Sequence, residues 1–186
     1  MSGRSRDDAA ATYESVADLR RLIRDVPDFP RRGIVFKDIT PLLLDPAGLA
    51  RCVEWMAERT ARPEAVVAIE SRGFIFGTGL ALHWGVPLIP ARKFGKLPGP
   101  TLRQKYTLEY GEDALEIRAD ALRPKQRAVI VDDLLATGGT AAATAGLVEQ
   151  LDARVEALLF VIELQGLKGR ERLAGYRVEA LIPVPV

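Results

Sequence analysis

The sequence contains one cysteine and one histidine, and this scarcity excludes several kinds of site. With Cys52 alone, the chain cannot form an internal disulfide or a cysteine-based zinc site. Cys52 lies among Leu49, Val53 and Met56, so we expect it to pack in the core. With His83 alone, histidine-clustered metal sites are excluded, and any serine triad would have to use this residue. The apolar neighbours of His83 favour a structural role instead.

The chain also lacks a long apolar run and a strong net charge. No window approaches about 18 uncharged apolar residues, and the start of the chain has no apolar segment of the export-signal type, so we expect neither membrane insertion nor secretion. A formal net charge of +1 provides no field for nonspecific binding of nucleic acid, so anions must be recognised locally. These absences favour a cytoplasmic protein that binds neither membranes nor nucleic acid.

The composition is ordinary for a globular domain. Of the 186 residues, 48% are hydrophobic and 27% are charged, which fits one domain with a full core. Residues 1–12 are polar and alanine-rich without periodicity, so we expect a disordered extension followed by a single domain over 13–186.

Apolar patterning predicts alternating helices and strands. Val16, Leu19, Ile23 and Val26 recur at helical spacing, which predicts a helix from Ser15 that Pro27 stops. Further helices are expected over 46–61, before residue 84, after residue 140 and over 167–173, with strands over 65–69, 86–92, 127–133, 155–162 and 176–182. Residues 106–110 and 114–117 alternate around 111–113 as a hairpin. The alternation indicates a doubly wound, mostly parallel α/β sheet flanked by helices.

Residues 129–140 combine four features of a ligand site: a β-branched run, two acids, a Thr-Gly-Gly-Thr turn and an alanine-rich helical segment. Such a turn presents backbone N–H groups and hydroxyls to a small anion, most naturally a phosphate. Asp132 and Asp133 would repel a phosphate, so we expect them to face hydroxyl groups or metal-bound water. The alternative is a plain strand, turn and helix that end in polar residues.

Two further loops follow strand carboxyl ends, where open α/β sheets bind ligands. Arg72 stands beside Gly73 after one strand and can offer a planar donor fork to a phosphate, although a surface charge is the alternative. Lys93 and Lys96 lie in a basic, glycine-hinged loop over 93–101 that can hold a pyrophosphate and close, although a solvated linker is the alternative.

Residues 129–140 resemble the phosphoribosyl-pyrophosphate signature of the type I phosphoribosyltransferase family. Four other stretches are similar to its adenine-specific members: Val-Phe-Lys-Asp-Ile-Thr-Pro at 35–41, Glu-Ser-Arg-Gly-Phe at 70–74, Gly-Lys-Leu-Pro-Gly-Pro-Thr at 95–101 and Leu-Glu-Tyr-Gly at 108–111. The resemblance runs from about Pro27 to Lys168. It implies a small N-terminal hood at about 27–45, a hairpin lid and a homodimer.

The resemblance also implies a reaction: transfer of ribose 5-phosphate from phosphoribosyl pyrophosphate to N9 of adenine, giving AMP and pyrophosphate in purine salvage. Mg²⁺ would bind through substrate oxygens and water, with no direct protein ligand. The implied site comprises Ala136, Thr137, Gly138, Gly139 and Thr140 for the 5-phosphate; Asp132 and Asp133 for ribose and magnesium-bound water; Ser71, Arg72, Gly73, Lys93 and Lys96 for pyrophosphate; Val35, Phe36 and Lys37 for adenine; and Glu109, Tyr110 and Arg72 for catalysis.

Several assignments depend on the resemblance alone. Phe36 by itself would be interpreted as core packing, and Glu109 as a solvated carboxylate. Family members commonly carry Pro or Arg where this chain has Phe94, which leaves the lysine geometry open. Two rivals also stay open: transfer to hypoxanthine, guanine or xanthine, and a non-catalytic sensor of phosphoribosyl pyrophosphate fused to a DNA-binding helix pair. One convincing helix in the first 30 residues is too little for such a module.

Overall fold

The computed structural model describes residues 13–108 and 111–185. It divides the chain into two compact units, Met1–Cys52 and Val53–Val186, and the division falls within helix α3 (Pro46–Glu58). The disordered extension expected over 1–12 lies outside the described residues, and the expected single domain over 13–186 stays a prediction. The two units are described separately.

The N-terminal unit is built around a two-stranded antiparallel ribbon. It contains helix α1 (Val16–Arg20), strands β1 (Arg24–Pro27) and β2 (Val35–Asp38), and helix α2 (Thr40–Leu44). The predicted helix up to Val26 is therefore wrong beyond Arg20, because Val26 pairs with Phe36 across the ribbon. Leu19 and Ile23 are buried as the helical pattern implied, but pairing between distant residues decides the backbone beyond them.

The second unit contains a seven-stranded sheet in the order β5-β6-β4-β3-β7-β8-β9. Its strands are β3 (Ala65–Ile69), β4 (Leu88–Lys93), β5 (Thr101–Leu108), β6 (Gly111–Arg118), β7 (Arg127–Leu135), β8 (Arg154–Gln165) and β9 (Val178–Pro185). The strands from β4 to β9 in this order are parallel, whereas β6 is antiparallel to both β4 and β5. The predicted doubly wound, mostly parallel sheet is confirmed.

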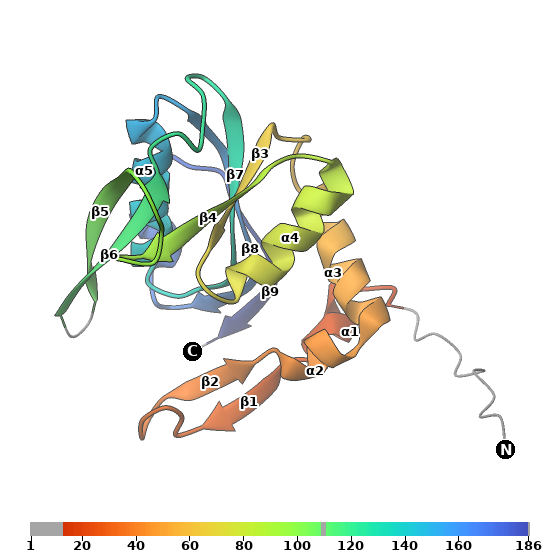
Figure 1. Ribbon diagram of the computed structural model, residues 1–186. Coiled ribbons are helices and arrows are strands. Elements are labelled where there is room, and N and C mark those ends of the chain that lie inside the picture. The colour runs from red at the N-terminus through yellow and green to blue at the C-terminus, as the bar shows by residue number, and fades with distance from the viewer. Residues whose placement is uncertain (1–12, 109–110, 186) are drawn as a thin grey trace, which may run out of the picture. The chain divides into compact units, whose positions relative to one another are not determined.

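Two helices cover the sheet from opposite sides. Helix α4 (Gly73–Trp84) joins β3 to β4, and α5 (Gly139–Gln150) joins β7 to β8, so the two crossovers run in opposite directions from the β3–β7 pair. Right-handed crossovers in opposite directions place their helices on opposite faces, as Figure 1 shows. The crevice beyond the carboxyl ends of β3 and β7 is thus the switch point at which such sheets bind ligands.

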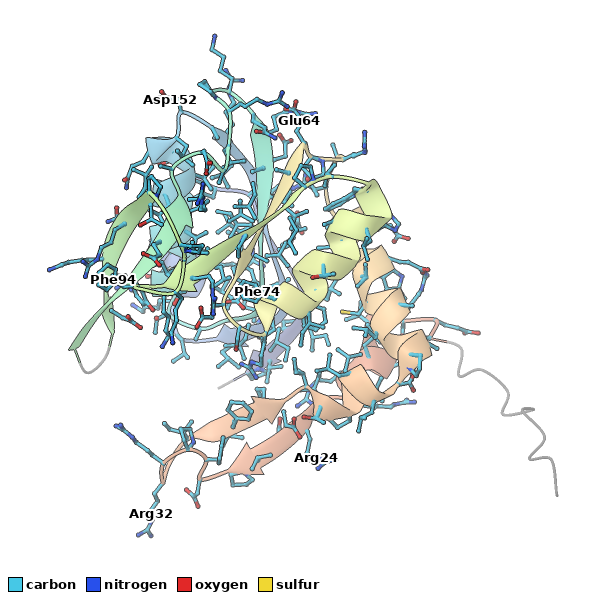
Figure 2. All side chains as sticks on the ribbon, viewed as in Figure 1. Arg24, Arg32, Glu64, Phe74, Phe94 and Asp152 are labelled. Carbon is cyan, nitrogen blue, oxygen red and sulfur yellow. The ribbon has the colours of Figure 1, made fainter. Side chains whose placement is uncertain are left out.

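Burial explains why the parallel strands read as continuous apolar runs. All five residues of β3 are buried, since helices cover both faces of the sheet. Helix α4 approaches β3 closely at Gly77, where an added Cβ would lie 2.5 Å from the Cβ of Ala68. Figure 2 shows Glu64 and Asp152 at the end of the sheet where β3 and β8 begin, and Phe74 at the opposite end.

Three details differ from expectation. Strand β7 continues past the two acids to Leu135, so the acids lie inside the strand rather than at its end. Strand β6 begins at Gly111, which pairs with Leu108 of β5, so the predicted turn at 111–113 is wrong. His83 is exposed in the last turn of α4, whereas Cys52 is buried as expected.

The remaining short helix, α6 (Gly169–Arg172), lies between β8 and β9 and corresponds to the helix predicted over 167–173. None of the helices in the described part of the chain has the length and apolar character needed to span a membrane.

Candidate active site

A cavity of about 330 Å³ opens at the carboxyl ends of β3 and β7. Its walls come from the loop after β3, the end of β4, the β5–β6 hairpin, the end of β7 and the start of α5. The lining residues are Glu70, Ser71, Arg72, Lys93, Tyr106, Leu115, Asp132, Asp133, Leu134 and Thr140. The structure thus brings together members of three predicted groups, those for the phosphate, the ribose and the pyrophosphate.

The acid pair is anchored by its own strand and by the loop after β3. The backbone N–H of Asp133 donates to Oδ1 of Asp132 over 2.8 Å. Arg72 Nη2 lies 3.0 Å from Asp133 Oδ2 as an ion pair. This buried Oδ2 nevertheless accepts no well-aligned hydrogen bond from the residues that the structure describes. Its charged contact is the Arg72 guanidinium, which ties the loop after β3 to the acid pair.

Gly73 lets the loop after β3 approach the acid pair. A Cβ at this position would lie 2.8 Å from the carbonyl oxygen of Val131 and 3.0 Å from Oδ1 of Asp132. The peptide bond between Glu70 and Ser71 is cis. A glycine at the start of α4 is therefore what allows Arg72 and the acids of β7 to share one cavity.

Electrostatics distinguish this acid pair from surface carboxylates. Desolvation raises the pKa of Asp132 well above its usual value, and the neighbouring Asp133 carboxylate raises it further. Desolvation also raises the pKa of Asp133, while the Arg72 guanidinium opposes the rise. The site therefore holds carboxyl groups that gain from a cation or from hydrogen-bond donors brought by a ligand.

The segment after β7 forms a second cavity of about 190 Å³ beside the first. It is lined by Asp132, Leu134, Leu135, Ala136, Thr137, Gly138, Gly139, Thr140, Ala141 and Phe160. Gly138 adopts the left-handed conformation (φ +75°) and caps the start of α5, whose first turn presents N–H groups without helical partners. All five residues predicted for the 5-phosphate thus line one concave surface at a helix start.

Lys93 lines the cavity from the end of β4 and forms an ion pair with the β5–β6 hairpin. Its Nζ lies 3.3 Å from Oδ2 of Asp113. The Tyr106 hydroxyl donates to the same Oδ2 over 3.2 Å and also hydrogen-bonds with the side chain of Thr140. Burial, with Asp113 nearby, raises the pKa of Tyr106 to about 12, so the hydroxyl stays protonated at neutral pH.

Tyr106, Asp113 and Glu70 are site residues that the sequence reasoning missed. Tyr106 and Asp113 face each other in the hairpin register. Placing the turn at 111–113, where strand β6 begins, hid this pairing. The signal that could have found it is the longer alternating run from Thr101 onward, which extends the first arm of the hairpin.

Other predicted residues are not in the cavity walls. Lys96 is exposed in the loop between β4 and β5. Val35, Phe36 and Lys37 lie on β2 in the N-terminal unit; there the Phe36 ring meets Phe29 edge to face at 5.2 Å, and Lys37 is buried beside Asp25 at 3.0 Å. Glu109 and Tyr110, predicted for catalysis, lie outside the described residues.

Phe94, the residue at which the chain departs from the family pattern, is not among the residues that line the cavity. Its ring is about half exposed and carries the Arg103 guanidinium 3.7 Å from its centroid. Figure 2 shows Phe94 on the side of the sheet where the hairpin lies. Its backbone N–H donates to the carbonyl of Ala114 over 3.0 Å, so the chain just after Lys93 stays tied to β6.

Comparison with known proteins agrees with this geometry. The family model for the phosphoribosyl transferase domain matches residues 41–176. The adenine phosphoribosyltransferase of Carboxydothermus hydrogenoformans is 56% identical over 167 residues, which cover 89% of this chain and 98% of the relative. The crystal structure of the enzyme of the same name from Thermoanaerobacter pseudethanolicus superposes with a TM-score of 0.89 at 47% identity, covering 91% of this chain and 100% of that one.

A third relative was solved with ligands. The Saccharomyces cerevisiae adenine phosphoribosyltransferase, in complex with adenine and an imino-altritol bisphosphate, has a TM-score of 0.84 at 40% identity and covers 89% of this chain and 97% of that one. The matched family domain spans the acid pair, the helix start after β7 and the loop after β3. The chain therefore belongs to the phosphoribosyl transferase domain family and, within it, to the adenine phosphoribosyltransferases.

Proposed function

We propose that this protein is a pentosyltransferase that transfers the 5-phosphoribosyl group of phosphoribosyl pyrophosphate to N9 of adenine, releasing pyrophosphate and forming AMP for purine salvage. One observation carries the proposal. Two adjacent cavities, which share Asp132, Leu134 and Thr140, bring together an acid pair on β7, a helix start suited to a phosphate and a group of cationic side chains. Phosphoribosyl pyrophosphate, the donor substrate, has a phosphate at one end, a pyrophosphate at the other and hydroxyl groups between them, so it matches this arrangement.

In this proposal phosphoribosyl pyrophosphate lies across the switch point of the sheet. Residues 136–140 bind the 5-phosphate through backbone N–H groups and hydroxyls. Asp132 and Asp133 accept hydrogen bonds from the ribose hydroxyls and from magnesium-bound water. Ser71, Arg72 and Gly73, with Lys93, receive the pyrophosphate, and Lys96 approaches from the loop after β4.

The charge distribution suits a dissociative transfer. As the bond from C1 to the pyrophosphate oxygen lengthens, positive charge develops on the sugar and negative charge on the leaving group. Arg72 and Lys93 stabilise the leaving group, and the acid pair faces the sugar. Preorganised charges of this kind supply most of the rate enhancement in many enzymes.

Magnesium is the expected cofactor, held through substrate oxygens and water. The chain fits this mode, since Asp132 and Asp133 both line the cavity and burial raises the pKa of both carboxyl groups, so a cation nearby would favour their charged forms. Bound there, the ion supplies charge neutralisation for the pyrophosphate.

Adenine is assigned to the N-terminal ribbon and the lid. The Phe36 ring would stack on the base, and backbone groups near Val35 and Lys37 would read its edge, since the amino group and N1 of adenine need an acceptor and a donor together. A missing partner costs about 1–3 kcal/mol, which disfavours a 6-oxo purine. Glu109 would hydrogen-bond near N7 and assist proton movement, with Tyr110 beside it.

We also propose a homodimer in the cytoplasm. On α4, Ile75 and Leu82 are seven residues apart and both exposed, Leu82 to 78%, and Leu88 on β4 is exposed as well. Residues at this spacing share one helix face, and an exposed apolar face of this kind suits a second copy of the chain. Fractionation of cells that express the full chain tests the compartment.

The test of the activity is a pyrophosphate-release assay with phosphoribosyl pyrophosphate, Mg²⁺ and one base at a time. Turnover with adenine and not with hypoxanthine, guanine or xanthine is expected. Turnover with another base alone would favour a different salvage enzyme. Binding of the donor without turnover of any base would instead favour the sensor.

The role of the lid is tested by Glu109→Gln. General acid–base assistance is typically worth about 10²–10⁴-fold, so kcat should fall by that order while donor binding is retained. Full turnover of the variant would remove Glu109 from the chemistry. Binding of the donor is measured separately by calorimetry.

A further inference from the structure

Glu116 is a buried acid that the proposed mechanism does not use. It lies on β6, opposite Arg92 of β4 on one side and Arg103 of β5 on the other, and its exposed fraction is 2%. A carboxylate buried this deeply requires several hydrogen bonds, because desolvation penalises its charge. Its pKa is nevertheless held below the usual value, since hydrogen bonds from the backbone outweigh the desolvation.

The donors to Glu116 come from the lysine loop, which we define as residues 93–97. Oε1 accepts from the backbone N–H groups of Lys96 and Leu97, each over 2.9 Å, and the backbone of Gly95 contributes a further hydrogen bond. Oε2 accepts from the Thr101 hydroxyl over 3.3 Å. Consecutive backbone N–H groups that converge on one carboxylate hold the turn in a single conformation.

The same loop is held from its other side by Arg92. Arg92 Nη1 donates to the carbonyl oxygen of Lys96 over 3.1 Å, and Arg92 Nε donates to Oε2 of Glu70 over 2.8 Å. Glu70 also accepts from the backbone N–H of Lys93 over 3.3 Å. Hydrogen bonds therefore run without a gap from Glu116 through the lysine loop to the residue that precedes Ser71 and Arg72.

We infer that Glu116 is a positioning residue for pyrophosphate recognition: it fixes the lysine loop so that Lys96 stands at a set distance from Lys93 and Arg72. The inference rests on the proposed function, since it assigns the two lysines to the leaving group. Glu116 itself is separated from the ligand by the loop it holds. Its contribution is preorganisation, because a loop already in its binding conformation loses less entropy when the donor binds.

The experiment compares Glu116→Gln with Thr101→Val. The amide keeps the size of the side chain but places an NH₂ group or a weaker acceptor against the loop N–H groups, whereas the valine removes only the long bond to Thr101. Glu116→Gln should raise the Kd and the KM for phosphoribosyl pyrophosphate by about tenfold and leave the KM for adenine unchanged. Thr101→Val should change each of these three constants by less than about twofold. An unchanged donor affinity in Glu116→Gln would overturn the inference.

A double-mutant cycle separates positioning from general stability. In a background of Lys93→Ala with Lys96→Ala, Glu116→Gln should cost almost no further donor affinity, because the groups it positions are gone. An equal tenfold loss in both backgrounds would overturn the inference. If Glu116→Gln does not fold, Glu116→Asp, which keeps the charge and shortens the reach, is carried through the same cycle. Failure of the unmodified chain to bind the donor would instead reject the proposed function.

Discussion

In the folded chain, burial and the neighbouring Asp133 disfavour the charged form of Asp132. Its pKa is raised by desolvation and by the adjacent Asp133, and the Arg72 guanidinium only partly offsets both effects. A carboxyl group with a raised pKa binds its proton more tightly when the chain is folded. The contribution of Asp132 to the free energy of unfolding therefore decreases as the pH rises from the ordinary aspartate pKa of 3.8 through the raised pKa.

We predict that Asp132→Asn stabilises the protein at neutral pH and weakens its use of the donor. The asparagine keeps an oxygen that can accept from the Asp133 N–H but carries no charge. Each pKa unit of the rise corresponds to about 1.4 kcal/mol, so a gain of several degrees in Tm is expected at pH 7 and little gain near pH 4. Thermal unfolding at both pH values and the KM for phosphoribosyl pyrophosphate provide the measurements.

The control is Asp120→Asn. Asp120 is an exposed acid whose pKa is lowered by the hydrogen bond from Arg118, so its charge favours the folded state. Its substitution should not raise the Tm and should leave the kinetics unchanged. Destabilisation of Asp132→Asn at pH 7 would show that the acid pair is not strained in the way its burial implies.

At the scale of elements, the loop after β7 packs closely against the start of α6. An alanine Cβ at Gly169 would clash with the carbonyl oxygen of Ala136 and lie 2.9 Å from the Leu135 side chain. A Cβ at Gly138 would in turn lie 2.7 Å from the carbonyl oxygen of Gly169. Residues 136–140, which we call the phosphate loop, therefore fit against α6 through two glycines from distant parts of the chain.

We predict that Gly169→Ala damages the phosphate loop. The new methyl group has backbone on one side and Leu135 on the other, so the loop must shift, at a cost of about 1–3 kcal/mol in unfolding free energy. The KM for phosphoribosyl pyrophosphate should rise with it. The measurements are chemical denaturation and initial rates at varied donor concentration.

Gly146→Ala is the matched control within α5. There the added Cβ meets only the Gln104 side chain, at 3.8 Å, and alanine favours the helix over glycine by about 0.5–1 kcal/mol. The control should stabilise the protein and leave the kinetics unchanged. Equal kinetic behaviour of the two alanine variants would refute the role assigned to Gly169.

The hairpin contributes to the site through Tyr106. We predict that Tyr106→Phe raises the KM for the donor several-fold, because the lost hydroxyl connects Asp113 with Thr140 of the phosphate loop. Tyr176→Phe is its control, since that hydroxyl also donates to a carboxylate, Glu149, but away from the cavity. Both variants should lose about 1 kcal/mol of stability, and only the first should alter steady-state kinetics. A kinetic change of the same size in both would contradict the prediction.

Elements with strong local patterns were predictable from sequence, and elements decided by pairing were not. The apolar runs of β3, β7 and β8 and the turn at Gly138 follow from local chemistry, and the rule that strand carboxyl ends bind ligands identified the loops of Arg72 and of the acid pair as candidate ligand loops. The ion pair between Arg72 and Asp133 was not predicted, because it joins distant parts of the chain. Strand β1 was not predictable, because its side chains have helical spacing and its partner is β2. The Tyr106–Asp113 pair required the register of a hairpin whose turn carries no decisive local signal.

At the scale of the whole molecule, we expect the exposed apolar face of α4 to be the contact surface of the proposed homodimer. We predict that Leu82→Glu gives a monomer at concentrations where the unmodified chain is a dimer, because a charge would be buried at the contact. Leu167→Glu, at an exposed leucine on another part of the unit, should remain dimeric. Sedimentation velocity distinguishes the species. A dimer in Leu82→Glu would exclude this face as the contact, and a monomeric unmodified chain would exclude the dimer.

The two lysines of the lysine loop differ in the structural element that holds their backbone. Lys93 is the last residue of β4 and pairs with Leu115, so its place is set by the sheet, whereas Lys96 follows a turn at Gly95 with a left-handed backbone. Residues inserted or deleted between Gly95 and Pro100 would displace Lys96 and leave Lys93 in register. A change of loop length would therefore disturb the hydrogen bonds that Lys96 makes to Glu116 and Arg92, while Lys93 would keep its pairing with Leu115.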